Sequence, residues 1–172
     1  MSLHETVGPA HTRISDVARL AGVERLTVYK HFPDADALFA ACSAHWRAAH
    51  PTPDPTPWAA ITDPRQRTRT ALAAVYRYFD ENEAMLANVI RDAATLPELR
   101  AHVEAGSLAY VAAVTELLVG GWKVRGRRRE RLATTAALVL DFHTWRLLVR
   151  RRGLSTEAAA ELGAELVACA AA

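Results

Sequence analysis

The chain has 172 residues, the length of one domain or of a small domain joined to a larger one. Hydrophobic residues make up 51% of it and are mostly alanine and leucine, with few aromatics, so the composition favours helix and argues against a mainly β protein. The formal net charge of +2 does not by itself indicate a nucleic-acid partner, and the absence of any uninterrupted apolar run of about 18 residues argues against a transmembrane helix.

The first pattern along the chain is a helix, a turn and a second helix. Residues 1–11 contain Gly8-Pro9 and can hold no long helix. Thr12 is a candidate N-cap for the helix that follows, and Gly22 stands where that helix must end and the chain reverse, a position that commonly needs a positive φ. The apolar residues on one face of this first helix are Ile14, Val17, Ala18 and Ala21. The residues expected on the buried face of the second are Val23, Val28 and Phe32. Residues 12–32 therefore predict a helix-turn-helix.

A further helix and a proline-rich stretch come next. Asp34 can cap a helix that we expect to reach about Ala49. Prolines at positions 51, 53, 55 and 57 then argue against helix and predict an extended, polyproline-like linker. We therefore expect a first domain over residues 1–49, a linker over 50–63 and a second domain over 64–172.

The second domain is predicted to be helical throughout, with short breaks. Pro64 and Pro97 suit the first turn of a helix, and Ser155 or Thr156 can cap the last one. The expected helices are residues 64–80, 83–95, 97–120, 132–149 and 156–170. Residues 123–131 (KVRGRRRER) are predicted to be an exposed, solvated basic connection. The fold class is therefore all-α.

With this pattern in view, the sequence resembles the tetracycline-repressor (TetR) family of bacterial transcriptional regulators. The residues that carry the resemblance are Thr12, Ile14, Val17-Ala18, Ala21-Gly22-Val23, Thr27-Val28-Tyr29, His31-Phe32 and Ala37-Leu38-Phe39. Beyond residue 39 the likeness is one of helical architecture. The resemblance implies an N-terminal helix-turn-helix DNA-binding domain followed by a helical bundle for ligand binding and dimerisation.

Three features depart from the family pattern. Family members begin with a long amphipathic helix, whereas only residues 1–11 precede the motif here, so we expect that first helix to be truncated. Glu24 stands where the family often has serine, and a carboxylate there would repel a phosphate. Ala35 stands where a lysine usually reaches the DNA backbone. Residues 1–46 hold four Lys/Arg against five Asp/Glu, a balance of −1 that is weak for a DNA-binding module.

The second helix of the motif is expected to present the DNA-contacting side chains. Arg25 could bind guanine bidentately, for about 1–3 kcal/mol of discrimination, and Leu26 could contact a thymine methyl. The resemblance implies phosphate contacts for Thr27, Tyr29 and His31, and Thr12 could present helix-terminal amides to a phosphate. The alternative is that all of these are ordinary solvated residues. The predicted DNA-binding residues are Thr12, Arg25, Leu26, Thr27, Tyr29, Lys30 and His31.

Aromatic, polar and polarizable residues on otherwise apolar helices are candidates for a ligand pocket. Any single one of them is more often plain core, and the resemblance implies a pocket without identifying its lining. The candidates are Tyr76, Phe79, Met85, His102, Tyr110, Asp141 and Trp145. The expected effector is an unidentified, largely apolar small molecule.

The sequence carries no pattern that indicates an enzyme. Asp141 and His143 are two residues apart, so they lie on different helical faces and do not suit a shared metal site. No HExxH motif, nucleophile elbow, glycine-rich phosphate loop or paired cysteine ligands occur. We therefore expect no catalytic residue, no metal and no cofactor.

The last two predicted helices are candidates for a homodimer interface. Small residues on them allow close approach, and two helices from each subunit would form a four-helix bundle. The alternative is that both helices are packed inside a monomer. The predicted interface residues are Leu132, Ala136, Val139, His143, Leu147, Leu162, Gly163 and Leu166.

The features beyond the motif predict a cytoplasmic protein. No basic N-terminal region precedes an apolar stretch, so a secretory signal is not expected. Cys42 and Cys169 are far apart in sequence, and we expect both to be small buried hydrophobes in a reducing compartment.

The predicted function is a ligand-responsive regulator, a repressor that binds a near-palindromic operator in double-stranded DNA as a dimer. The alternative is a dimeric ligand-binding or interaction protein with weakened or lost DNA binding.

Overall fold

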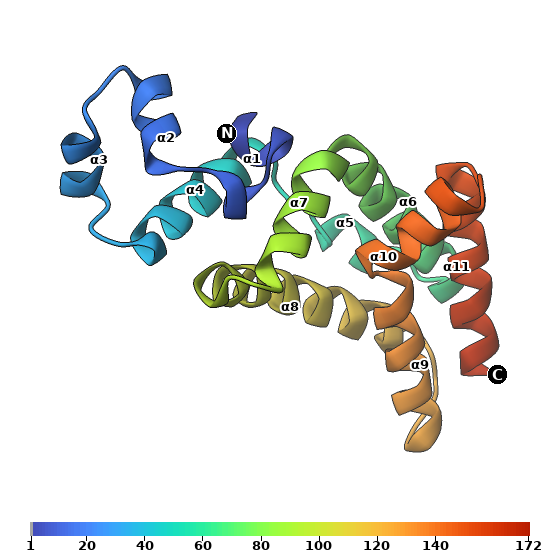
Figure 1. Ribbon diagram of the computed structural model, residues 1–172. Helices are drawn as coiled ribbons and strands as arrows, with labels where there is room; N and C mark the ends of the chain where they lie inside the picture. Colours follow the sequence, from blue (N-terminus) through green and yellow to red (C-terminus); the bar gives the residue numbers. More distant parts are fainter. Residues whose placement is uncertain (1) are drawn as a thin grey trace. The chain divides into compact units, whose positions relative to one another are not determined.

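The computed structural model describes residues 2–172, and within that range it contains helices and no strand (Figure 1). The all-α prediction is confirmed. The described chain forms two compact units, which are considered separately. The first unit consists of Met1–Pro51 and Asn82–Ser107, and the second of Thr52–Glu81 and Leu108–Ala172.

The first unit contains the helix-turn-helix. Its elements are α1 (Ser2–Thr6), the short 3₁₀ helix η1 (Pro9–His11), α2 (Ile14–Ala21), α3 (Arg25–His31), α4 (Ala35–Ala49) and α7 (Glu83–Ala93). Gly22 ends α2 with a left-handed φ of 66°, as the sequence predicted. Asp34 caps α4 by accepting a hydrogen bond from Ala37 N at 2.8 Å. Ala18 of α2 and Val28 of α3 are both buried, and the two helices pack on each other.

Two local predictions for the motif are wrong. Thr12 does not cap α2, because the N-cap residue is Arg13, which makes no side-chain cap bond. Val23 is 41% exposed rather than buried, since it lies in the turn between α2 and α3 and not on the inner face of α3. Phe32 is half-buried.

The proline-rich stretch is not extended throughout. Residues 51–54 have no regular structure, but Thr56–Ala59 form the one-turn helix α5. Proline is compatible with a helical first turn, where its missing N–H would have no partner, and Pro57 occupies such a position in α5. Trp58 of this turn is buried in the second unit.

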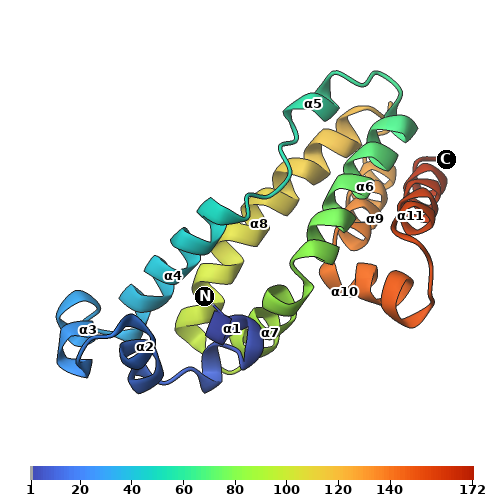
Figure 2. The same cartoon turned by 90° about the horizontal axis from the view of Figure 1, so that it is seen from above.

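The second unit is built around α6 (Pro64–Glu81), α9 (Arg127–Val139) and α11 (Thr156–Ala171), which Figures 1 and 2 show side by side. Its largest fully buried side chains include Leu72, Tyr76, Leu132 and Trp145. Ser155 caps α11 by accepting a hydrogen bond from Ala158 N at 3.1 Å, as the sequence allowed.

The predicted helix over residues 132–149 is wrong in two respects. Helix α9 already begins at Arg127, so half of the basic run expected to be a connection is helical. The chain then breaks at Leu140, and Asp141 caps a new short helix α10 (Phe142–Trp145), accepting hydrogen bonds from His143 N at 2.7 Å and Thr144 N at 3.2 Å. Helix α10 continues into the π-helix η2 (Arg146–Arg151).

Helix α8 (Pro97–Gly120) begins in the first unit and ends in the second. It is the one described helix that is long and apolar enough to cross a bilayer by length and composition, with a mean hydropathy of 1.4 over its most apolar window. The core helix of a soluble protein meets the same criterion, so this is weak evidence for a membrane span.

Two further expectations concern the cysteines and the domain boundary. Cys42 is half-buried and Cys169 is exposed, so the prediction that both are buried is wrong for Cys169, which lies near the C-terminal end of α11. Both thiols are free. The two compact units divide the chain differently from the predicted domains, since residues 82–107 belong to the first unit. The domain division at residues 50–63 stays a prediction.

Candidate nucleic-acid interface

Helix α3 presents a mixed basic, apolar and aromatic face to solvent. Val28 is its buried anchor, and the face opposite that anchor is open. Among the predicted DNA-binding residues on α3, Thr27 is half-buried and the others are exposed, namely Arg25, Leu26, Tyr29, Lys30 and His31. The structure therefore places these predicted residues on one short helix and leaves their side chains available for a partner.

The turn before α3 is fixed by backbone hydrogen bonds. Val23 N donates to Ala18 O at 3.0 Å and Gly22 N to Arg19 O at 3.3 Å, which closes the end of α2. Glu24 is the N-cap residue of α3, but its side chain makes no cap bond. A carboxylate is therefore exposed at the start of the helix that carries most of the predicted DNA-binding residues.

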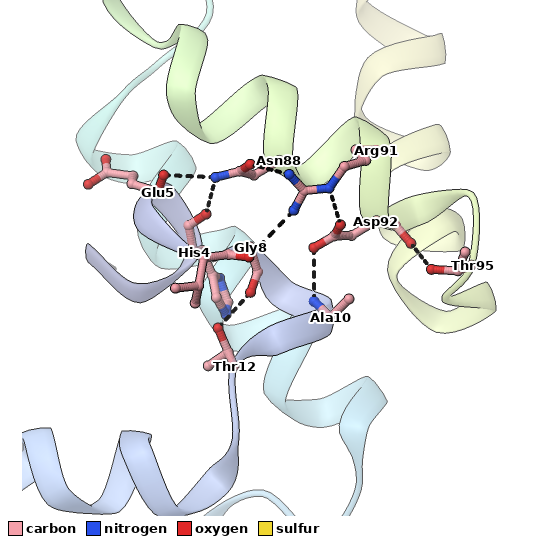
Figure 3. Close-up of polar contacts among 10 residues, drawn as sticks. His4, Glu5, Gly8, Ala10, Thr12, Asn88, Arg91, Asp92 and Thr95 are labelled. Carbon is pink, nitrogen blue, oxygen red and sulfur yellow. Dashed lines mark hydrogen bonds and ion pairs between the residues drawn. The ribbon is translucent and has the colours of Figure 1, made fainter.

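The segment that leads into α2 is held by α7, as Figure 3 shows. Asn88 Nδ2 donates to the carbonyls of His4 at 3.0 Å and Glu5 at 2.8 Å, at the end of α1. Asp92 Oδ2 accepts a hydrogen bond from Ala10 N at 2.9 Å, and Asp92 Oδ1 accepts one from Arg91 Nε at 2.7 Å. We call Asn88, Arg91 and Asp92 the α7 clamp.

The carboxylate of Asp92 is the most buried charge of this clamp, with a side chain only 4% exposed. Burial raises the pKa of this carboxyl group, but hydrogen bonds from Arg91 and Ala10 and the positive charge of Arg91 outweigh burial. The pKa of Asp92 therefore lies below its ordinary value, and the clamp holds Asp92 as a carboxylate.

Thr12 belongs to the same lead-in segment rather than to a helix cap. Its hydroxyl donates to Gly8 O at 2.8 Å, and its side chain is half-buried. The sequence pattern did not predict any residue of the α7 clamp. The one available signal was Asp92 itself, a carboxylate between the apolar positions Val89 and Ala93 of an amphipathic helix.

The charge of the first unit is unfavourable for DNA. It contains seven Lys/Arg and nine Asp/Glu, a formal balance of −2, whereas the second unit contains fourteen and ten, a balance of +4. The cations that could meet DNA from α2 and α3 are few, and Arg19 is already paired with Asp16 at 3.2 Å. Affinity from phosphate neutralisation is therefore expected to be modest.

The predicted pocket residues do not form one cluster. Met85 and His102 belong to the first unit, where His102 Nε2 lies 2.9 Å from Asp36 Oδ1. In the second unit, Asp141 is exposed and caps α10, and the Tyr110 hydroxyl donates to Pro53 O at 3.0 Å. The remaining three, Tyr76, Phe79 and Trp145, do lie together.

An aromatic cluster brings those three residues together with Phe142. The Phe79 ring centroid lies 5.5 Å from that of Phe142 and 5.9 Å from that of Trp145. Tyr76 is buried and donates its hydroxyl to Val139 O at 2.8 Å, and burial raises the pKa of this phenol. Trp145 Nε1 is buried without a hydrogen-bond partner within the described part of the chain.

The predicted dimer-interface residues fall into two groups. Four are buried within the single chain, where α9 packs on α11, namely Leu132, Ala136, Val139 and Gly163. Three are exposed, namely His143, Leu147 and Leu166, and Leu162 is half-buried. Only the exposed group and part of Leu162 are available to a second subunit.

Comparison with known proteins agrees with this geometry. The family model for bacterial regulatory proteins of the tetR family matches residues 1–42. No curated protein and no solved structure matches the chain. The matched residues cover the lead-in segment, both helices of the helix-turn-helix and the first half of α4. The N-terminal part of the chain, with its helix-turn-helix, is thus similar to the DNA-binding region of bacterial regulatory proteins of the tetR family.

Proposed function

We propose that this protein is a ligand-responsive repressor that binds a near-palindromic operator as a homodimer. The observation that carries the DNA-binding part is the open face of α3, where Arg25, Tyr29 and Lys30 are exposed around the buried anchor Val28. A helix of this kind fits the major groove of B-DNA, and a single one makes too few contacts for specific binding. Two helices about 34 Å apart would meet two half-sites on one face of the duplex.

The side chains of α3 divide between base and backbone contacts. The guanidinium of Arg25 suits the O6 and N7 acceptors of guanine, and Leu26 suits a thymine methyl. Lys30, Tyr29 and His31 suit phosphate oxygens, which fix register without specifying sequence.

The aromatic cluster of the second unit supports an effector site. Its rings would favour a flat, largely apolar molecule, and the unpartnered N–H of buried Trp145 would favour one with a hydrogen-bond acceptor. Such an effector changes the affinity for the operator only if it binds the DNA-binding conformation and the non-binding conformation of the protein with different affinities. Helix α4, which leads into the proline-rich segment, is our candidate for the element that moves.

The test begins with selection of bound duplexes from random DNA by the purified protein, followed by gel shift. We expect an enriched sequence with two inverted half-sites, bound more weakly as salt rises. Arg25→Ala should reduce affinity by about tenfold and relax the preference at one base of each half-site. Arg47→Ala, which removes an exposed arginine of α4, is the matched control and should have little effect.

A second candidate function is favoured by the charge of the first unit. Its balance of −2 and the exposed Glu24 at the start of α3 both oppose DNA. The chain would then be a dimeric ligand-binding or interaction protein that binds DNA weakly or not at all. Enrichment of no sequence in the selection, at low as well as physiological salt, would favour this second candidate.

A further inference from the structure

We propose that the α7 clamp positions the helix-turn-helix for DNA binding, with Asp92 as its principal positioning residue. The proposal rests on the proposed DNA binding by α3. It assigns a role in that binding to residues that bond to the backbone of the lead-in segment and not to the side chains of α3. Asn88, Arg91 and Asp92 lie more than 50 residues after α3 in the sequence, yet all three bind the segment that leads into α2 (Figure 3).

The clamp binds main-chain atoms of the lead-in segment, so it fixes the path of the backbone. Asn88 binds the carbonyls of His4 and Glu5, and Arg91 Nη2 donates to Val7 O at 3.4 Å. Arg91 Nη1 also donates to Asn88 Oδ1 at 2.8 Å, which ties the clamp residues to one another.

Asp92 contributes the contact nearest to α2. Both of its carboxylate oxygens are used, one by Ala10 N and one by Arg91 Nε. Hydrogen bonds to a charged group in a buried site are stronger than neutral ones. Removing this carboxylate would leave Ala10 N and Arg91 Nε without the acceptor that each uses here.

The chain between the clamp and α2 has little freedom to absorb a displacement. Gly8 has φ 86°, and a side chain there would overlap Arg91 Nη2 and Asp92 Oδ2. Pro9 is buried and has a fixed φ. Hydrogen bonds from His11 N to Gly8 O at 3.3 Å and from the Thr12 hydroxyl to the same carbonyl close the turn.

The position of α7 is therefore transmitted to the start of α2, which begins at Ile14. Because α2 and α3 are joined by a hydrogen-bonded turn and pack on each other, they should move together. Loss of the clamp should then lower operator affinity by misplacing α3, while the side chains that contact DNA stay intact.

The test compares Asp92→Ala and Asn88→Ala with the unmodified chain. Glu116→Ala is the matched control, since it removes an ion-paired carboxylate, bonded to Arg129 Nη2 at 2.6 Å, from the second unit. The probes are a duplex selected from random DNA by the unmodified protein and a shuffled duplex of equal length. We expect Asp92→Ala to weaken binding of the selected duplex by about tenfold or more and to weaken binding of the shuffled duplex by a smaller factor. Glu116→Ala should bind both duplexes as the unmodified chain does.

Unchanged affinity for the selected duplex would overturn the proposal. So would an equal loss on both duplexes, because a general loss of folded protein weakens both alike. If circular dichroism shows that Asp92→Ala loses helix at the assay temperature, Asn88→Ala decides by the same criteria, since it removes the bonds of the clamp to the carbonyls of His4 and Glu5.

A measurement without DNA separates this proposal from the proposed function. Hydrogen exchange of the amides in residues 10–17 should be faster in Asp92→Ala than in the unmodified chain, while exchange in α11 is unchanged. Equal exchange at residues 10–17 would overturn the clamp. If the unmodified protein selects no duplex, the proposed function fails, and the exchange experiment still decides the role of Asp92.

Discussion

Gly8 is the position where a single methyl group should have the largest local effect. Its φ of 86° and ψ of 161° belong to a region that is almost restricted to glycine, and a Cβ would overlap the side chains of Arg91 and Asp92. Gly22 also has a positive φ, 66°, but a methyl group at that position would meet no atom within 4 Å. We expect Gly8→Ala to lower the free energy of unfolding by about 2–4 kcal/mol and Gly22→Ala by about 1 kcal/mol, measured by urea denaturation. Equal losses would show that the contacts with α7 do not constrain Gly8.

Asp92 should make the first unit sensitive to acid. Because the pKa of this carboxyl is lowered in the folded protein, its contribution to stability is present above its ordinary pKa of 3.8 and is lost as pH falls through the folded value. The difference in unfolding free energy between the unmodified chain and Asp92→Asn should therefore be largest above about pH 5 and shrink towards about pH 3. Thermal melting of both proteins across this range measures it, and a difference that does not change with pH would contradict the assignment.

At the scale of helices, Gly163 shows how closely α11 packs on α6. It is buried, and a Cβ would lie 2.6 Å from Leu72 Cδ1 and 3.6 Å from Val139 Cβ. Gly163→Ala should destabilise the second unit by about 1–3 kcal/mol, because the core must shift to admit the methyl group. Gly120→Ala, at the end of α8 with nothing within 4 Å, is the control and should be neutral or slightly stabilising. Chemical denaturation of the two variants tests this, and similar stabilities would mean that Leu72 moves aside easily.

Helix starts are predictable where local chemistry decides them. Asp34, Pro64, Pro97 and Ser155 each begin a helix through a cap or a fixed φ that the sequence displays. The break at Asp141 is not predictable in this way, because apolar periodicity continues across it and a cap resembles a polar residue inside a helix. The turn α5 escapes prediction for the opposite reason, since four closely spaced prolines indicate an extended chain more strongly than a helical turn.

For the whole molecule, the candidate site was predictable in one part and not in another. The exposed face of α3 follows from helical periodicity within a dozen residues, so the sequence pattern predicted it well. The α7 clamp joins pairs of residues that are separated by 82 to 84 positions in the sequence. Its bonds to the lead-in segment go to backbone atoms, so they require no particular residue types in that segment. The net charge of +2 likewise conceals an acidic first unit and a basic second one.

The proposed homodimer can be tested at exposed leucines of the second unit. Since Leu132, Ala136, Val139 and Gly163 are buried within one chain, the interface on η2 and α11 would have to use the exposed pair Leu147 and Leu166. The double variant Leu147→Glu with Leu166→Glu places four charges in such an interface, two from each subunit, and should give a monomer in sedimentation velocity.

Two other exposed leucines sharpen this experiment. Leu26→Glu is the matched control, because Leu26 lies on α3; it should leave the dimer intact while weakening DNA binding. Leu108, on the outer face of α8, belongs to a different surface. If Leu108→Glu is monomeric while the double variant is still dimeric, the interface lies on α8 and not on η2 and α11. If the proposed homodimer binds a palindrome through both half-sites, whichever variant is monomeric should lose affinity for that palindrome. A duplex with a single half-site should then no longer distinguish this variant from the dimer.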